Sequence, residues 1–408
     1  MIDFNQNPFL YCLKDCSTVV TSSPHESVDV AVVGGGPAGA VLARGTAAAG
    51  LKTVIFERDR LPRYKTCGGG VQHRVAKLVG CDLTPVIRTS VDRMVFTYRL
   101  EHPIERVSPQ PVVHMVMRDA FDAYLVEQAA RAGAEVRDRT RVDRVDCRDD
   151  GVDLVTASGV VRAAVVVGAD GANSRVARDL GLSGGVDLDL ALEAEIVTPD
   201  RLRERWATTA LLDLGSLPSG YGWLFPKGDG LSVGVGGPFK DRALLRPYFE
   251  QLRRYLNLED ATVERFTGHQ LTLRRPGAPI VAGRGILLGD AAGLVDPFTG
   301  EGLLGAVVSA QLAIGPVVRA VAGEPGALDD YQRAVDRELM PELLEARIVL
   351  RVFDRMPRLA HRLMGTGDLF WRNLAKLMLG ETTYRSLGGG TFRVGWRLLD
   401  RLLPPAAA

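Results

Sequence analysis

The clearest pattern of apolar and polar positions lies near the start of the chain. A short apolar run at residues 28–33 is followed by a glycine-rich turn and an alanine-rich segment at about 37–49. A second apolar run at 52–56 ends at Glu57. Short continuous apolar runs are typical of buried parallel strands, and the segment between them has the length of a helix that begins with proline. The pattern therefore predicts a strand, a helix and a second strand that pack as one unit.

The turn in this unit has the glycine spacing of a dinucleotide-binding fingerprint. Gly34 permits a tight turn, Gly36 lets the backbone approach a pyrophosphate, and Gly39 lets the helix lie close to the sheet. The free N–H groups of the first helical turn favour phosphate. Glu57 follows Gly34 by 23 residues and can accept hydrogen bonds from a ribose diol. The strands, the helix and the acid together predict a bound dinucleotide.

The rest of the chain divides into regions of different periodicity. Residues 118–132 have helical spacing, and 141–167 have the alternation of antiparallel strands. Between 185 and 275, short strand-like segments alternate with Gly, Pro and Asp turns, which predicts a separate and mostly antiparallel sheet. Residues 300–322 predict an almost wholly apolar core helix, and 328–408 are largely helical.

These regions predict an α/β fold, α+β overall, in which one sheet is inserted into another domain. An apolar run at 281–289 predicts a return to a buried strand after the insertion. We expect a Rossmann-like cofactor domain, an antiparallel β-sheet substrate domain and a helical C-terminal region. The predicted limits are an N-terminal extension at 1–27, a discontinuous cofactor domain at 28–80, 118–184 and 276–330, a substrate domain at 81–117 and 185–275, and the helical region at 331–408.

Composition narrows the class of protein without naming an activity. The chain has 408 residues and a formal net charge of +1, so nothing global points to nucleic acid. We see no secretory signal and no uninterrupted apolar run of about 20 residues. Five scattered cysteines fit a reducing cytoplasm, where we expect the protein. Cys12 and Cys16 lie four residues apart without a second pair, so no metal site is predicted.

Two further segments place polar groups at the ends of strands. One turn carries Asp170, with donors for phosphate or ribose at Ser174 and Arg175. In the other, Asp290 follows an apolar strand and is placed to hold a ribityl hydroxyl, with a plain helix cap as the less favoured alternative. The turn at 297–302 then begins a long helix, whose N-terminus can stabilise negative charge on a reduced flavin.

The order of these three segments resembles the p-hydroxybenzoate hydroxylase-like flavoprotein superfamily, which binds FAD. Within it, three local matches resemble the geranylgeranyl reductase family. Residues 62–70 (PRYKTCGGG) look like its cysteine-glycine loop, and 221–227 (YGWLFPK) look like its aromatic substrate-cavity strand. Residues 289–302, from Gly-Asp-Ala-Ala-Gly to Gly-Glu-Gly, also follow the reductase form. The resemblance covers about residues 28–325.

The resemblance implies an FAD site and a set of residues that form it. Asp170 is included because its turn supplies the far end of the cofactor. The other implied positions are Gly34, Gly36, Ala38 and Gly39 at the pyrophosphate, Glu57 and Arg58 at the adenosine, Cys67, Gly68 and Gly69 beside the isoalloxazine ring, Arg118 at the ribityl phosphate, Val142 near the adenine, and Asp290, Gly302 and Leu303 over the ribityl chain and ring.

Cys67, Tyr221 and Trp223 are the candidate catalytic residues. A Cys67 thiol beside the flavin could donate a proton to an alkene carbon, or a small residue could simply fit a tight loop. Tyr221, Trp223 and Phe225 alternate along a strand and so share one face. An aromatic wall suits a long hydrocarbon substrate, although half-buried strands are often aromatic in any protein.

The resemblance implies an FAD-dependent reductase that adds hydride and a proton to carbon–carbon double bonds of an isoprenoid or other hydrophobic chain. The alternatives are an FAD-dependent monooxygenase or halogenase acting on an aromatic or carrier-bound intermediate, and a non-catalytic flavoprotein. Gly293 stands where the hydroxylases usually carry histidine, and Gly300-Glu301-Gly302 where halogenases usually show Ser-Ser-Gly. No second glycine fingerprint follows a strand, so NAD(P)H or an electron-donor protein is expected to bind transiently.

The C-terminal region adds one expectation about partners. Residues 331–408 hold 13 Lys and Arg against 8 Asp and Glu, a net charge of +5. Arg351, Arg355, Arg358 and Arg362 have helical spacing on one face. That face either contacts an anionic membrane surface peripherally or is simply solvated. The expected substrate is a hydrophobic small molecule.

Overall fold

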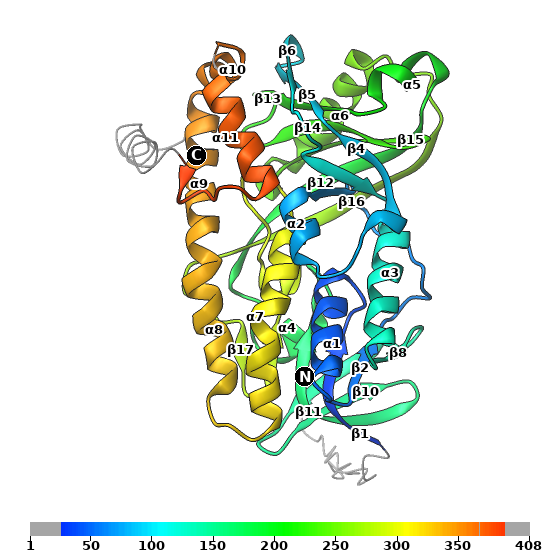
Figure 1. Cartoon of the computed structure of the whole chain (residues 1–408), viewed down its shortest axis with the longest axis vertical. Helices are drawn as coiled ribbons and strands as arrows, with labels where there is room; N and C mark the ends of the chain where they lie inside the picture. Colours follow the sequence, from blue (N-terminus) through cyan, green and yellow to red (C-terminus); the bar gives the residue numbers. More distant parts are fainter. Residues whose placement is uncertain (1–25, 367, 388–408) are drawn as a thin grey trace, which may run out of the picture.

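The computed structural model describes residues 26–366 and 368–387, whose elements form two halves along the long axis of the molecule (Figure 1). The lower half is built on a sheet of β1 (Glu26–Val33), β2 (Thr53–Phe56), β8 (Glu135–Arg137), β9 (Val142–Cys147), β10 (Val152–Thr156), β11 (Gly159–Gly168), β17 (Val281–Ala282) and β18 (Gly285–Leu287). Its order is β17-β18-β11-β1-β2-β8, and β18, β11, β1, β2 and β8 are parallel. This is the predicted Rossmann-like sheet.

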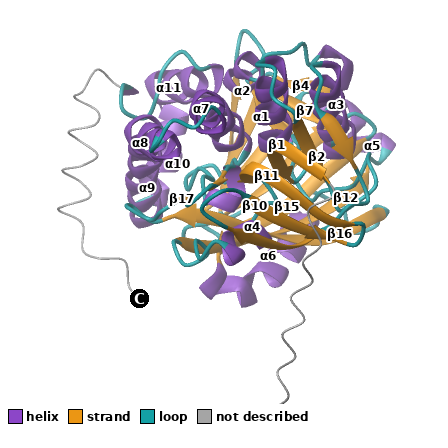
Figure 2. Ribbon diagram, turned by 90° about the horizontal axis from the view of Figure 1, so that it is seen from below, coloured by secondary structure: helices purple, strands orange, loops and turns teal. Residues whose placement is uncertain are grey.

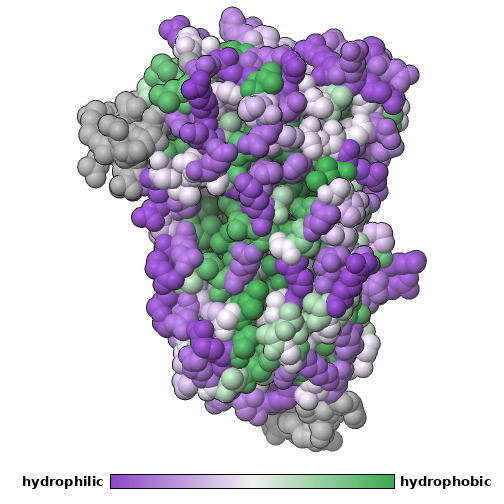
Figure 3. Space-filling view, in the orientation of Figure 1, coloured by the Kyte–Doolittle hydropathy of each residue, from purple (hydrophilic) through white to green (hydrophobic). Residues whose placement is uncertain are grey.

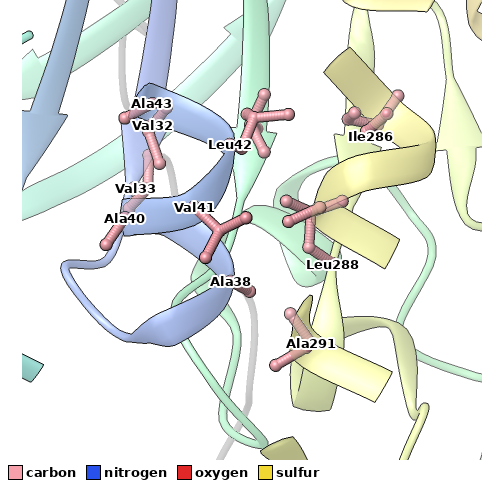
Figure 4. Packing of buried hydrophobic residues seen from close by; sticks show 14 of the residues in the cluster. Val32, Val33, Ala38, Ala40, Val41, Leu42, Ala43, Ile286, Leu288 and Ala291 are labelled. Atoms are coloured by element: carbon pink, nitrogen blue, oxygen red, sulfur yellow. The ribbon is translucent and has the colours of Figure 1, made fainter. Parts of the chain in front are cut away.

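Three helices cover one face of this sheet. They are α1 (Pro37–Ala48), α3 (Arg118–Arg131) and α7 (Leu303–Val321), and α1 packs against both of the others. Val41 and Leu42 of α1 belong to the same hydrophobic cluster as Ile286 and Leu288, which lie far away in the sequence (Figure 4). The first and last segments of the predicted cofactor domain therefore share one core.

The upper half is a second sheet. It contains β5 (Arg93–Tyr98), β6 (Glu101–Val107), β12 (Val186–Val197), β13 (Thr209–Leu214), β14 (Tyr221–Lys227), β15 (Gly230–Pro238) and β16 (Val263–Arg274), in the order β16-β12-β15-β14-β13-β5-β6. Its neighbouring strands are antiparallel except for β5 and β13. One face is covered by α6 (Arg242–Tyr255), seen below the strands in Figure 2. The buried side of α6 carries Leu245, Phe249 and Leu252.

Shorter elements connect the two halves. A three-stranded sheet has the order β3 (Gly70–Gln72), β7 (Val113–Val116), β4 (Ile87–Val91). The remaining short helices are α2 (His73–Leu78), α4 (Arg175–Asp179) and α5 (Asp200–Trp206), with single 3₁₀ turns at Thr84–Val86, Phe239–Asp241 and Gly289–Ala292. The segment before β3 contains the predicted cysteine-glycine loop, which therefore lies where the halves meet.

Four C-terminal helices run along one side of both halves (Figure 1). They are α8 (Ala327–Glu338), α9 (Met340–Arg355), α10 (Pro357–Thr366) and α11 (Asp368–Leu379). At the lower end, the hydroxyl of Tyr331 on α8 donates to the carbonyl oxygen of Leu287 on β18, at 2.7 Å. At the upper end, Phe353 and Trp371 join a hydrophobic cluster with Phe96 of β5. The helical region therefore bridges the two sheets.

Two sequence expectations were wrong in detail. The run at 281–289 is not one strand but the hairpin β17–β18 followed by a 3₁₀ turn, because the chain reverses at Gly283, where φ is +55°. The four arginines do not share one helix, because α9 ends at Arg355 and α10 begins at Pro357. Proline disfavours helical backbone at the residue before it, and Met356 leaves the helical conformation with φ −132° and ψ 52°. The extension at 1–25 and the segment 388–408 lie outside the described residues.

Helix α7 occupies the core beside the strand ends, as its composition predicted. By length and composition alone it could cross a membrane, and it is the one such helix in the described part of the chain. It packs on α1 and α8, and its buried Ser309 hydroxyl accepts a hydrogen bond from the backbone N–H of Gly289 at 3.1 Å. These contacts are those of an interior helix.

The hydroxyl of Tyr331 gives a test of how firmly the helical region is attached. Replacement Tyr331→Phe leaves the buried carbonyl of Leu287 without a partner, so we expect the free energy of unfolding in urea to fall by about 1–2 kcal/mol. Tyr124→Phe is the matched control, because its hydroxyl donates to the Asp82 carbonyl in an exposed position. That variant should stay within about 0.5 kcal/mol of the wild type. Equal losses would contradict this account of Tyr331.

Candidate active site

A cavity of about 940 Å³ lies where the two halves and the C-terminal helices meet. All but one of the predicted site residues line it, although they come from distant parts of the chain. These are Gly34, Gly36, Ala38, Glu57, Arg58, Cys67, Gly68, Gly69, Arg118, Val142, Asp170, Tyr221, Trp223, Asp290, Gly302 and Leu303. Among the described residues, no group of three or more His, Cys, Asp or Glu side chains is arranged to hold a metal ion.

The glycine fingerprint has two kinds of position. At Gly34, φ is +108° and an added Cβ would lie 2.3 Å from the carbonyl oxygen of Ala169, so the backbone itself requires glycine. Gly39 is the one predicted residue that does not line the cavity. An added Cβ there would lie 2.1 Å from the Gly34 carbonyl oxygen, so the packing of the helix on the turn leaves no room for a side chain. At Gly36 the nearest atom to an added Cβ is 3.9 Å away. Glycine there leaves space open toward the cavity rather than relieving a contact within the protein.

Glu57 is fixed at the end of β2 by two donors. Its Oε2 accepts from the backbone N–H of Gly35 at 3.0 Å and pairs with Nε of Arg63 at 3.1 Å. Arg63 also pairs with Asp122 at 3.0 Å. Sequence reasoning missed Arg63 and Asp122, although Arg63 lies within the quoted loop motif. Arg58 lies on the exposed rim beside these groups and pairs with Asp59.

Arg118 begins α3 and is buried beside the cysteine loop. Its guanidinium makes two hydrogen bonds to Asp122, at 2.8 and 3.0 Å. Burial opposes the charge of Arg118, but Asp122 and the Cys67 sulfur outweigh that effect, so the pKa of Arg118 lies above its usual value. The cavity therefore holds a permanent positive charge next to Cys67.

The cysteine-glycine loop lies across the substrate sheet, held there by side chains of β16. Thr66 donates to the hydroxyl of Thr267 at 2.9 Å, and the Tyr64 hydroxyl is 3.4 Å from the same atom. Lys65 Nζ is 3.1 Å from Nε2 of His269. Residues 64–66 therefore attach the loop to β16 just before Cys67.

From Cys67 onward, the loop rests on β14. The Lys227 ammonium donates to the backbone carbonyl of Cys67 at 2.9 Å, and an added Cβ at Gly69 would lie 2.8 Å from Lys227 Cε. Gly69 has φ +78°, and the Cys67 sulfur accepts from its N–H at 3.4 Å. An added Cβ at Gly68 would lie 2.9 Å from the ring of Phe225. Glycine at these positions lets the loop lie directly on the aromatic strand.

Asp290 lies beside the imidazole of His269 and the ammonium of Lys65 at the wall of the cavity. Its Oδ2 is 3.6 Å from His269 Nε2 and 3.9 Å from Lys65 Nζ. Burial would raise its pKa, but the contact with His269 and the charges of Lys65 and Arg118 lower the pKa of Asp290 to about 2. Burial also lowers the pKa of Lys65, with Arg118 acting in the same direction. The carboxylate is therefore ionised and remains a strong acceptor for a hydroxyl.

Asp170 lines the cavity, but its oxygens are used within the protein. They accept from the Ser174 hydroxyl at 2.5 Å and from the backbone N–H groups of Arg175 and Val176 at 2.6 and 3.3 Å. Burial raises the pKa of Asp170, while these hydrogen bonds act against the rise. The carboxylate caps α4, so it shapes the turn, and its oxygens are already occupied by these three donors.

The aromatic strand forms one wall of the cavity, and its polar atoms are also occupied. The rings of Tyr221 and Trp223 have centroids 5.9 Å apart, and Trp223 stacks on Phe225 at 6.2 Å. The Tyr221 hydroxyl donates to the carbonyl of Thr299, and burial raises the pKa of Tyr221 above its usual value. The three side chains present ring surface to the cavity, as their alternation predicted.

The cavity continues away from the loop as an apolar chamber. Its walls come from β4, β5, β7 and β13 on one side and from α9, α10 and α11 on the other. The lining side chains are Val91, Met94, Phe96, Val113, Met115, Ala210, Leu212, Phe353, Met364, Leu374, Leu377 and Met378. Flexible methionines adapt to irregular apolar ligands. Sequence reasoning found none of these residues.

Two buried acids at the cavity were also missed. Glu301 Oε1 accepts from the N–H of Leu304 at 2.9 Å and so caps α7, while its Oε2 faces Arg74 Nη2 at 3.5 Å. Burial raises the pKa of Glu301 to about 7, and Arg74 acts against that rise. Glu193, on β12, hydrogen-bonds to Ser232 at 3.0 Å and lies 3.5 Å from the Lys227 ammonium. Both carboxyls line the cavity and are close to titrating at neutral pH.

The sequence is similar to those of several known proteins. Residues 27–203 match the family described as FAD binding domain. The chain is 31% identical over 355 residues to the chloroplastic geranylgeranyl diphosphate reductase of Oryza sativa subsp. japonica. The aligned region covers 80% of this chain and 75% of that protein. It is 29% identical over 388 residues to digeranylgeranylglycerophospholipid reductase 1 of Methanopyrus kandleri, which covers 84% of this chain and 99% of that one.

Solved structures agree with the sequences. A geranylgeranyl bacteriochlorophyll reductase-like protein from Thermoplasma acidophilum superposes with a TM-score of 0.72 and 25% identity, over 92% of this chain and 96% of that one. A flavin-dependent brominase superposes with a TM-score of 0.70 and 20% identity, over 92% and 99% of the two chains, which shows a shared fold alone. With its FAD-binding domain and these relatives, the chain belongs to the geranylgeranyl reductase family of FAD-dependent oxidoreductases.

Proposed function

We propose that the protein reduces carbon–carbon double bonds of an isoprenoid or other long hydrophobic chain. The observation that carries this proposal is the apolar chamber that opens from the cysteine-glycine loop and ends under α9, α10 and α11. A chamber without charged side chains along this stretch of its wall favours a hydrocarbon over a polar aromatic substrate. Two relatives are named as reductases of geranylgeranyl compounds, and these names support the same substrate class.

We propose that FAD lies along the polar part of the cavity. The donors of the first turn of α1 would hold its pyrophosphate, Glu57 its ribose diol and Asp290 its ribityl hydroxyls. Bound FAD supplies the two electrons of the reaction as hydride. The ring would lie beside Cys67, and the substrate chain would lie against Trp223. Asp170 is the weakest member of the predicted set, since its oxygens already cap α4.

The alternative is an oxygen-using flavoenzyme, a monooxygenase or halogenase. The shared fold with the brominase keeps this alternative open. A cavity wall of aromatic and aliphatic side chains nevertheless favours the reductase. Halogenases usually have a Trp-x-Trp-x-Ile-Pro strand, and this chain has Tyr221 in the position of the first tryptophan. We further propose that NAD(P)H or an electron-donor protein reduces the flavin in a transient encounter.

We also propose that α10 and α11 touch an anionic membrane surface, where such a chain would be dissolved. Leu359 and Leu363 on α10 and Leu369 on α11 are 46%, 40% and 69% exposed. Arg358 and Arg362 are exposed one position before each leucine of α10. Figure 3 shows hydrophobic residues at the top of this face over these helices, and others down its centre over α7. Exposed leucines next to arginines are typical of helices that lie in a lipid interface.

Gly36 tests the placement of the cofactor. Gly36 has φ −84°, which alanine adopts freely, and space around it inside the protein. We expect Gly36→Ala to fold with an unchanged melting temperature without FAD, and to bind FAD at least about tenfold more weakly in a fluorescence titration of apoprotein. Gly34→Ala is the contrasting variant and should lose the folded protein itself. Unchanged FAD affinity in Gly36→Ala would rule out this placement.

The reaction is tested by mixing dithionite-reduced enzyme with a polyprenyl substrate under anaerobic conditions. We expect the flavin to reoxidise and the substrate to gain one hydrogen molecule for each double bond reduced. Ala210→Phe places a ring inside the chamber and should slow reoxidation by long chains at least about tenfold, whereas exposed Ala207→Phe should not. Absence of reoxidation and of mass gain in the wild type would reject the reductase, and an oxygenated or halogenated product in air would favour the alternative.

Membrane contact is tested by co-sedimentation with vesicles. The wild type should bind vesicles rich in anionic phospholipid more tightly than neutral ones, because Arg358 and Arg362 accompany the leucines. Replacing Leu359, Leu363 and Leu369 by serine should weaken this binding at least about tenfold. Leu244→Ser removes an equally exposed leucine from α6 and serves as the control. Equal binding of the triple variant and the control would exclude α10 and α11 as the contact.

A further inference from the structure

We propose that Glu193 donates the proton of the reductive step, that burial and the negative charge of Glu195 keep it protonated, and that Lys227 and Ser232 hold it in position. The inference rests on the proposed function, and it names a donor different from Cys67. Glu193 lines the cavity between the aromatic wall and the cysteine-glycine loop. Its neighbours decide which of its two oxygens carries the proton.

The cluster contains one cation and two carboxyls. The Lys227 ammonium lies 2.7 Å from Glu195 Oε1, 2.9 Å from the Cys67 carbonyl oxygen and 3.5 Å from Glu193 Oε1. The side chains of Lys227 and Glu193 are 2% exposed and that of Glu195 is 10% exposed. An ammonium has three N–H donors, and these three acceptors match them.

The charge of the cluster is balanced only when one carboxyl is protonated. With both carboxyls ionised, a buried site would carry one uncompensated negative charge, which is costly away from water. Glu195 is the closer partner of Lys227, at 2.7 Å against 3.5 Å for Glu193. Glu193 is the carboxyl that holds the proton, and burial raises its pKa to about 7, with Lys227 acting against the rise.

Hydrogen-bond directions place that proton on Oε2 of Glu193. The indole N–H of Trp223 can only donate, and it donates to the Ser232 hydroxyl at 3.1 Å. The Ser232 hydrogen is then donated to Glu193 Oε1 at 3.0 Å, where Lys227 also approaches. Oε1 of Glu193 therefore accepts two hydrogen bonds, one from Ser232 and one from Lys227. Among the described residues nothing hydrogen-bonds to Oε2, which leaves the acidic O–H available to a substrate in the cavity.

The proposed step balances as follows. Hydride adds to one carbon of the double bond, and the electron pair of the π bond takes the proton from Glu193 at the other carbon. The carboxylate of Glu193 then regains a proton from solvent. The two electrons come from the reduced FAD of the proposed function, which an external donor must reduce again before the next double bond.

Other acidic groups at the cavity are less suited to this role. The Tyr221 hydroxyl donates to the Thr299 carbonyl, and Glu301 caps α7 while it faces Arg74. The Cys67 sulfur accepts a hydrogen bond from the N–H of Gly69 at 3.4 Å and lies beside the guanidinium of Arg118. Asp189 also lines the cavity, and burial raises its pKa to about 6. Glu193 is preferred because Ser232 and Lys227 fix its Oε1, which leaves Oε2 directed to the cavity without a hydrogen-bond partner among the described residues.

The first test compares two glutamine variants in anaerobic single turnovers with a polyprenyl substrate. Glu193→Gln keeps an acceptor for Ser232 and removes the acidic proton, so reoxidation of the reduced enzyme should slow at least about 100-fold. FAD occupancy and reduction by dithionite should stay unchanged. Reoxidation of Glu193→Gln at the wild-type rate would overturn the proposal.

Glu195→Gln is the matched variant on the same strand. It leaves Glu193 as the only carboxylate partner of Lys227, so Glu193 should ionise more readily and the alkaline loss of rate should move to lower pH. In the wild type the rate should fall as pH rises above about 7. Tyr64 and Cys67 are the other titratable side chains near the cluster, and Tyr64→Phe and Cys67→Ser should keep the wild-type alkaline limit. An unmoved limit in Glu195→Gln would overturn the role of the pair.

A second readout needs no turnover. The infrared difference spectrum of wild-type minus Glu193→Gln holoenzyme should show the carbonyl band of a protonated carboxyl at pH 6 that fades toward pH 8. Glu301 contributes a separate band, which the difference between the wild type and Glu301→Gln identifies. Absence of a protonated-carboxyl band from the wild type minus Glu193→Gln difference would overturn the assignment of the proton. If the wild type shows the band but reduces no polyprenyl substrate, the proposed function fails and the protonation of Glu193 stands.

Discussion

A buried ammonium helps to tie the two halves of this protein together at the place where chemistry is expected. Lys227 reaches from the substrate sheet to the backbone carbonyl of Cys67, and its charge is matched by carboxyls of β12. A cation this deeply buried must keep all of its partners, because an unpaired charge in the interior costs several kcal/mol. The loop, the aromatic strand and the acidic strand therefore cannot shift independently. Glycine at positions 68 and 69 follows from the same contact, since the loop must lie flat on Phe225 and on the lysine stem.

The cavity is polar at one end and apolar at the other, and this gradient organises its parts. Charged side chains gather where β2 and β18 end and α3 begins, around Glu57, Asp290 and Arg118. Beyond Cys67 the walls become aromatic and then aliphatic. The buried acids sit at the boundary between these two environments. A charged cofactor and a hydrocarbon can thus meet end to end without either entering surroundings that exclude it.

The sequence was most informative where function depends on local spacing. The fingerprint at Gly34–Gly39, the acid at Glu57 and the alternation from Tyr221 to Phe225 are each readable within a few residues, and the fold class followed from them. Asp170 was placed at the correct turn, but its hydrogen bonds within the turn were not foreseen. Glu193 and Glu195 were overlooked because alternating acids in a strand usually indicate a solvated face. Here the polar face of β12 is turned into the cavity, which depends on strand order and register across the whole sheet.

The apolar chamber has one further consequence. Its far wall belongs to α9, α10 and α11, which lie outside both sheets and follow the cofactor-binding segments in the chain. The reach of the chamber is thus set by a part that carries none of the FAD-binding contacts inferred for the lower half. Changes at Met364, Leu374 or Met378 can lengthen or shorten the space while the redox machinery stays the same. Because of this separation, the C-terminal helices can determine which chain lengths the cavity accepts while the catalytic residues stay unchanged.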